Sequence, residues 1–156
     1  MTALNDMYNM KIFELAAAIP RQERLDNPDA TATAHSKLCG STVAVDLKMG
    51  EDGRVNAYGQ TVKACLLGQA SAAVMGREIV GSTPEELRDI GRIMRAMLKD
   101  GGSPPTGRWA DLAMLEPVKD YKARHASTLL IFDAVERALA LIEARQSGVE
   151  PTIAAQ

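Results

Sequence analysis

The sequence predicts an α+β fold in which a three-stranded antiparallel sheet is covered on one face by helices. Segments that alternate polar and apolar residues or favour β-branched ones occur only between residues 31 and 62. One stretch before them and several after them carry apolar residues at helical spacing. Strands and helices grouped in this way are typical of α+β proteins. The chain has 156 residues, so we expect one domain over 1–146 and a flexible C-terminal tail over 147–156.

The N-terminal part is expected to hold a helix and a connector. Apolar side chains recur at helical spacing within residues 4–19, and Pro20 ends the run. The polar segment 21–30 contains Asn27-Pro28, a turn signal, and leads to the strands. Strands are expected over 31–35, 41–49 and 54–62, with a hairpin at 50–53.

The middle strand predicts which face of the sheet is buried. Because side chains alternate along a strand, Val43, Val45 and Leu47 point to one face, and Asp46 and Lys48 to the other. We therefore expect the valine face to lie under the helices and the Asp46 face to lie in water.

Helices are expected from Cys65 to the end of the domain. The first, after Cys65, is small and apolar on nearly every side. The second has a clear start, with Thr83 as N-cap, Pro84 at the first position and Glu86 completing a capping box. A short helical piece is expected around Trp109–Leu115, with Trp109 anchoring it.

The last helix is expected to begin near Ser127, which is a suitable N-cap, and to bury one face. The residues of that face are Phe132, Val135, Leu139 and Ile142. The helix is expected to end near Gln146, before the tail.

Composition excludes several classes of function. The net charge is −2 and only two Phe, one Trp and three Tyr are present, so neither a basic surface nor a stacking platform for nucleic acid is expected. No apolar run reaches the length of about 18 residues that a membrane span requires, and the N-terminus is not a secretory signal. We therefore expect a cytoplasmic protein with reduced thiols. No set of nucleophile, base and orienting residue indicates an enzyme.

The two cysteines, Cys39 and Cys65, are the residues with the most chemical interest. Cys39 falls in the break between the first two expected strands, and Cys65 falls where the third strand gives way to a helix. Both are therefore expected at one end of the sheet. A helix N-terminus stabilises the thiolate, which is the form that binds soft metals. Inert buried cysteines, or a Cys39–Cys65 disulfide with Cα atoms within about 7 Å, are the alternatives.

Three segments of the sequence resemble those of a known family. "RLDNPDATATAHSKLCGSTVAVDLKMGEDGRV", "CLLGQASAAVMGREIVGSTPEEL" and "RHASTLLIFDAVERAL" follow one another in order. They resemble the cysteine-bearing segments of the U-type iron–sulfur cluster assembly scaffolds, the NifU N-terminal-like family. The resemblance covers nearly the whole chain, about residues 4–145, and implies the NifU N-terminal/SufE-like α+β fold described above.

The resemblance also implies a site. In the family, three cysteines and an aspartate two residues after the first cysteine hold the cluster or zinc. Cys39 and Cys65 match the first two cysteines, whereas Ser41 stands at the aspartate position and Ser127 at the third cysteine. Clusters and zinc sites usually take four thiolate or imidazole donors. The remaining donors would come from a second chain's cysteine pair, glutathione, or His125.

The resemblance implies a non-enzymatic scaffold that holds iron and sulfur or a nascent cluster, or a single Fe or Zn ion, through Cys39 and Cys65. A cysteine desulfurase would supply the sulfur, apo iron–sulfur proteins would receive the cluster, and the chain could form a homodimer. The alternative function is that of a degenerate paralogue, an interaction or regulatory module that binds a desulfurase and carries no cluster.

Overall fold

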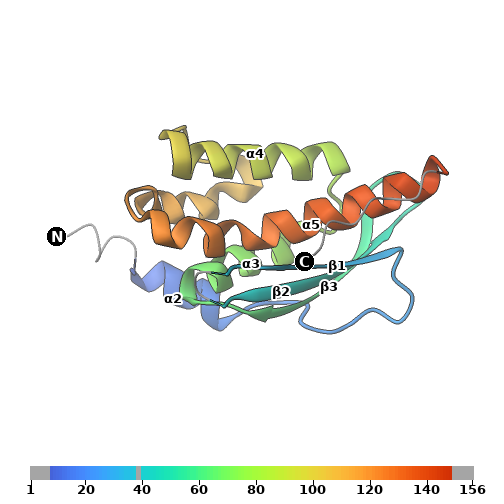
Figure 1. Ribbon diagram of the computed structural model, residues 1–156, viewed down its shortest axis with the longest axis horizontal. Helices are drawn as coiled ribbons and strands as arrows, with labels where there is room; N and C mark the ends of the chain where they lie inside the picture. The colour runs from blue at the N-terminus through green and yellow to red at the C-terminus, as the bar shows by residue number, and fades with distance from the viewer. Residues whose placement is uncertain (1–7, 38–39, 149–156) are drawn as a thin grey trace.

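The computed structural model describes residues 8–37 and 40–148, arranged as a sheet with helices stacked on it (Figure 1). In chain order the elements are α2 (Met10–Ala17), β1 (Ala30–His35), β2 (Thr42–Met49), β3 (Val55–Lys63), α3 (Leu66–Glu78), α4 (Pro84–Asp100), the 3-10 helices η1 (Gly107–Asp120) and η2 (Lys122–Arg124), and α5 (His125–Gln146). The predicted tail, 147–156, lies almost wholly outside the described residues.

The sheet has the order β1-β2-β3, and both pairs of strands are antiparallel. Helix α5 packs on β1 and β2, and α3 packs beside it against β3. Helix α4 contacts α5 from the side away from the sheet, as the stacked ribbons show (Figure 1). The predicted α+β fold, with helices on one face of a three-stranded sheet, is confirmed.

In the middle strand, the prediction for the valine face is confirmed, and the prediction for the Asp46 face is wrong. Val43, Val45 and Leu47 are buried in the core beneath the helices. Asp46 was expected in water, but it is buried as well, because the connector before β1 crosses the opposite face of the sheet. Alternation assigns side chains to faces and does not reveal what covers the second face.

Asp46 is held by four hydrogen bonds. Its carboxylate accepts from Nε and Nη2 of Arg24, at 2.7 and 3.2 Å, from the Leu25 N–H at 3.0 Å and from the Thr31 hydroxyl at 2.6 Å. Burial alone would raise the pKa of Asp46, but these hydrogen bonds and the Arg24 charge outweigh it and lower that pKa. The buried carboxylate is therefore fully paired.

The same connector is fastened to β3. The Gln60 N–H donates to the Arg21 carbonyl at 2.9 Å, and Gln60 Nε2 donates to the Pro20 carbonyl at 3.0 Å. At Gly59 a Cβ atom would lie only 2.1 Å from the Glu23 carbonyl oxygen, so only glycine allows this approach.

We call this region the connector clasp. It consists of Arg21, Arg24, Asp46, Gly59 and Gln60.

Helix α4 starts as its sequence predicts, with the Thr83 hydroxyl accepting from the Glu86 N–H at 3.1 Å. The carboxylate of Glu86 accepts from Trp109 Nε1 at 3.0 Å and from Arg108 at 2.7 Å. Trp109 is buried at the start of η1, which extends well beyond the expected helical piece and ends at Asp120. Glu86 thus ties α4 to η1.

Helix α5 begins at His125, two residues earlier than expected. Ser127 therefore lies inside the first turn and is not the N-cap, which is Arg124. The predicted buried residues Phe132, Val135 and Leu139 lie in the core. The early start turns Ser127 toward the N-terminus of α3.

Candidate functional site

One end of the sheet gathers the residues that the sequence singled out. Thr42, the first residue of β2, pairs with Lys63, the last residue of β3. The loop between β1 and β2 therefore lies at the same end as the junction that carries Cys65. This loop closes on itself, because the Ser36 N–H donates to the Ser41 carbonyl at 2.8 Å. Cys39 lies in this loop but outside the described residues.

Cys65 stands at the N-cap of α3 and is partly exposed. Its thiol donates to the hydroxyl of Ser127, with Sγ and Oγ 3.2 Å apart. The Ser127 hydroxyl in turn donates to the Arg124 carbonyl at 3.2 Å, and Ser127 is 1% exposed. We call Cys65 and Ser127 the thiol–serine pair. It joins residues 62 positions apart in the sequence.

A glycine lets the two helix ends come together. A Cβ atom on Gly68, in the first turn of α3, would lie 2.9 Å from the Ser127 carbonyl oxygen and 2.9 Å from the Ala64 Cβ. Both contacts are closer than real Cβ atoms show, so a larger residue would push α3 away from α5. No motif in the sequence marks Gly68 as part of the site. The available signal is its place in the run of small residues after Cys65.

Of the two other candidate residues, Ser41 is buried at the same end of the sheet, and His125 is buried against the backbone at the end of η1. The Nε2 atom of His125 lies 3.0 Å from the Val118 carbonyl oxygen and 3.1 Å from that of Lys119. His125 is 8% exposed. Its Nε2 is engaged with these backbone carbonyls.

The described part of the chain offers few metal donors. Within residues 8–37 and 40–148, no three or more His, Cys, Asp or Glu side chains are grouped so that they could hold a metal ion. Cys65 has one close polar side-chain neighbour there, the neutral hydroxyl of Ser127. In the same part of the chain, no helix is long and apolar enough to cross a membrane.

The fold and the paired positions at the sheet end define a U-type scaffold architecture. The crystal structure of a nitrogen-fixing NifU-like protein (N-terminal) from Brucella abortus matches with a TM-score of 0.90 and 52% identity, over 92% of this chain and 99% of that one. A SUF-system scaffold candidate from Fervidobacterium islandicum AW-1 shares the fold, with a TM-score of 0.78 and 20% identity over 86% and 98% of the two chains.

The sequence comparison agrees with the structural one. The iron–sulfur cluster assembly scaffold protein IscU of Thermotoga maritima is 26% identical over 133 residues, which are 85% of this chain and 92% of that protein. No family model matches the sequence. The chain belongs to the NifU-like, U-type scaffold family, as its three quoted segments implied. It is accordingly a scaffold and not an enzyme.

Proposed function

We propose that this chain is a carrier in iron–sulfur cluster assembly. It holds iron and sulfur, or a nascent cluster, transiently through Cys39 and Cys65 and releases this cargo to apo-proteins. The observation that supports the proposal most is the contact between Cys65 and Ser127. These are two of the four positions that the family resemblance equates with ligands, and they meet at a partly exposed end of the sheet.

The thiol–serine pair suits transient binding. Cys65 is the N-cap of a 13-residue helix and presents its sulfur at a partly exposed position. When a metal ion binds the sulfur, the Ser127 hydroxyl can turn and donate to it. The Arg124 carbonyl then keeps its other hydrogen bond, from the Thr128 hydroxyl at 2.7 Å. A neutral hydroxyl is a weaker metal ligand than a thiolate, so the cargo is held less firmly than by four cysteines.

The remaining donors are proposed to come from outside this chain, since His125 is engaged with backbone carbonyls. The cysteine pair of a second copy would complete a four-thiolate cluster in a homodimer, and glutathione would do the same for a monomer. A single Fe or Zn ion in a tetrahedral site has the same requirement. The proposed sulfur donor is a cysteine desulfurase, and the proposed compartment is the cytoplasm, where thiols stay reduced.

A second candidate function rests on the two buried serines. With Ser41 and Ser127 at ligand-equivalent positions, the chain would keep the fold as an interaction or regulatory module for a desulfurase and carry no cluster. The two functions differ in one measurable property, namely iron and sulfide bound per chain.

Anaerobic reconstitution with ferrous iron and sulfide tests the carrier function. After desalting, visible absorption and iron and sulfide analysis are compared for the wild type, Cys39→Ala, Cys65→Ala and the double variant. Ser127→Cys supplies the third thiolate. Ser147→Cys adds a thiol just after the far end of α5, about 30 Å from Ser127 along the helix, and is the matched control.

The wild type is expected to bind cargo, the double variant to lose it, and Ser127→Cys to retain it longer, while Ser147→Cys behaves as wild type. A wild type that retains neither iron nor zinc but captures a desulfurase would refute the carrier function and support the interaction module. Mass spectrometry after mild oxidation separates a third role, since a Cys39–Cys65 disulfide as the main product would indicate thiol redox chemistry.

A further inference from the structure

The two outer edges of the sheet differ in how their backbone groups are satisfied. At the β3 edge, the Gln60 N–H donates to the Arg21 carbonyl at 2.9 Å. At the start of the same strand, the Val55 N–H donates to Ser82 at 2.9 Å, and the Val55 carbonyl accepts from Gly81 at 2.8 Å. The connector therefore covers this edge at Gln60, and the α3–α4 loop covers it at Val55.

The register of β1 shows which of its groups point outward. Ala32 pairs with Val45 and Ala34 with Val43, and the same ladder continues to the hydrogen bond from the Ser36 N–H to the Ser41 carbonyl. Since backbone groups alternate in direction along a strand, the even-numbered residues of β1 bond β2. The odd-numbered residues, Thr31, Thr33 and His35, direct their N–H and C=O groups to the outer edge.

One contact confirms this direction. The outward carbonyl of Thr33 accepts from Nη1 of Arg137 on α5 at 2.7 Å. The outward N–H groups of Thr31, Thr33 and His35 have no acceptor among residues 8–37 and 40–148. All three residues are exposed. We call these three residues the open edge.

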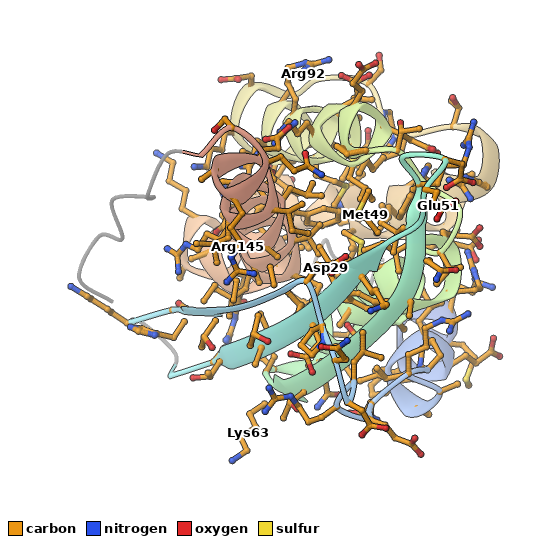
Figure 2. All side chains as sticks on the ribbon, turned by 90° about the vertical axis from the view of Figure 1, so that its right-hand side faces the viewer. Asp29, Met49, Glu51, Lys63, Arg92 and Arg145 are labelled. Carbon is orange, nitrogen blue, oxygen red and sulfur yellow. The ribbon has the colours of Figure 1, made fainter. Side chains whose placement is uncertain are left out.

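Three cations lie beside the open edge, and the carboxylate of Asp29, near its start, already accepts from the Met49 N–H at 2.7 Å. Arg137 reaches Thr33 from α5, and Arg145 donates to the Asp29 carbonyl at the start of β1, where Figure 2 shows the two residues close together. Lys37 follows the strand at its other end and is exposed. A row of free donors with cations along it suits a strand that brings carbonyl oxygens and carboxylates.

We propose that the open edge binds an extended, acidic segment of a partner protein, which adds as a fourth strand beside β1. Its backbone carbonyls accept from the three outward N–H groups, which recur every second residue, about 6.8 Å apart. Its acidic side chains lie near Arg137 and Arg145. This is β-strand addition, in which the backbone gives affinity and the side chains give specificity. The thiol–serine pair is not part of this surface.

A matched pair of variants tests the proposal. Thr33→Pro removes the central outward N–H, and an edge strand tolerates proline where its N–H faces outward. Thr33→Val keeps that N–H and the β-branched shape. The probe is a fluorescent peptide of four Val-Glu repeats, with four Val-Lys repeats as the charge control. Binding is followed by fluorescence anisotropy, and circular dichroism checks the fold of each variant.

The Val-Glu peptide is expected to bind the wild type and Thr33→Val equally, and Thr33→Pro about tenfold more weakly. The Val-Lys peptide is expected to bind less well than Val-Glu. No saturable binding of Val-Glu to the wild type, or equal binding to Thr33→Pro, would overturn the proposal.

A second measurement does not depend on the variants. Amide exchange of the wild type, read by NMR, is expected to slow at Thr31, Thr33 and His35 when the Val-Glu peptide is added. Slowing at Gln60 instead would contradict the proposal. Sedimentation of the wild type adds one more outcome, since a dimer that Thr33→Pro dissociates would assign the open edge to a second copy and refute an acidic partner.

Discussion

The connector clasp and the thiol–serine pair are each centred on one buried polar side chain, Asp46 and Ser127, yet they are stabilised in opposite ways. In the clasp, a carboxylate receives four hydrogen bonds, two of them from a guanidinium. In the pair, a neutral thiol donates one bond of 3.2 Å to a neutral hydroxyl. Hydrogen bonds to ionised groups are roughly twice as strong as neutral ones. The clasp therefore fixes the fold, and the pair can exchange its bond for a ligand at little cost.

The largest effect is expected at Gly59 in the clasp. Gly59→Ala places a Cβ against the Glu23 carbonyl oxygen, and a backbone atom cannot rotate away. We expect the free energy of unfolding to fall by about 3 kcal/mol in urea denaturation. Thr61→Ala, on an exposed position of the same strand, is the control and should change it by less than about 0.5 kcal/mol. Equal effects of the two variants would show that the connector does not press on β3.

The next largest effect is expected at Asp46. Asp46→Asn removes the charge that Arg24, Leu25 and Thr31 bond, and should lower the free energy of unfolding by about 2 kcal/mol at pH 7. Asp26→Asn, on an exposed residue of the same connector, is the control.

The contribution of Asp46 to stability should depend on pH in a defined direction. The pKa of Asp46 is lowered in the folded chain, so its contribution is present above the unfolded value of about 3.9 and is lost as pH falls through the folded pKa. The difference in the free energy of unfolding between wild type and Asp46→Asn should therefore shrink as the pH falls below about 4. A gap that stays constant from pH 7 to pH 3 would mean that the carboxylate charge is not what stabilises the clasp.

A smaller effect is expected at Gly68, beside the thiol–serine pair. Gly68→Ala brings a Cβ against the Ser127 carbonyl and the Ala64 Cβ, and should cost about 1.5 kcal/mol in the same assay. The double variant Gly68→Ala with Ala64→Gly relieves only the second contact. It should therefore recover less than half of the lost free energy of unfolding. Full recovery would show that α5 can move away from α3 without a cost in stability.

The smallest effect is expected at Ser127. Ser127→Ala removes one weak neutral bond and should change the free energy of unfolding by less than about 1 kcal/mol. In a Cys39→Ala background, iodoacetamide should alkylate Cys65 more slowly, because the reacting thiolate no longer has the Ser127 hydroxyl to donate to it. Ser147→Ala is the control. A loss as large as that of Asp46→Asn would show that the pair stabilises the fold as the clasp does.

The sequence predicted the elements well because periodicity and capping are local. The alternation of β2 and the Thr83 cap both follow from neighbouring residues, and both are confirmed on these points. Asp46 was placed in water wrongly, because its burial depends on Arg24 and Leu25, more than 20 residues away in the chain.

The contacts of the candidate site could not be predicted from local sequence patterns either. Family resemblance, not spacing, associated Cys65 with Ser127, and the structure shows how Gly68 permits their contact. Ser127 has the residue type of an N-cap, but α5 starts earlier, at His125, whose ring lies against the carbonyls at the end of η1. No local pattern encodes that contact.

The hydrogen bonds from α5 to β1 have a consequence for folding during synthesis. Arg137 and Arg145 bond the carbonyls of Thr33 and Asp29 across 104 and 116 residues of sequence. A ribosome adds about 5–20 residues per second, so β1 is synthesised seconds before the helix that covers it. During that interval the nascent sheet lacks its largest helix. Chains that terminate before α5 should accordingly aggregate or be degraded, and folding of this domain should be completed only after α5 has been synthesised.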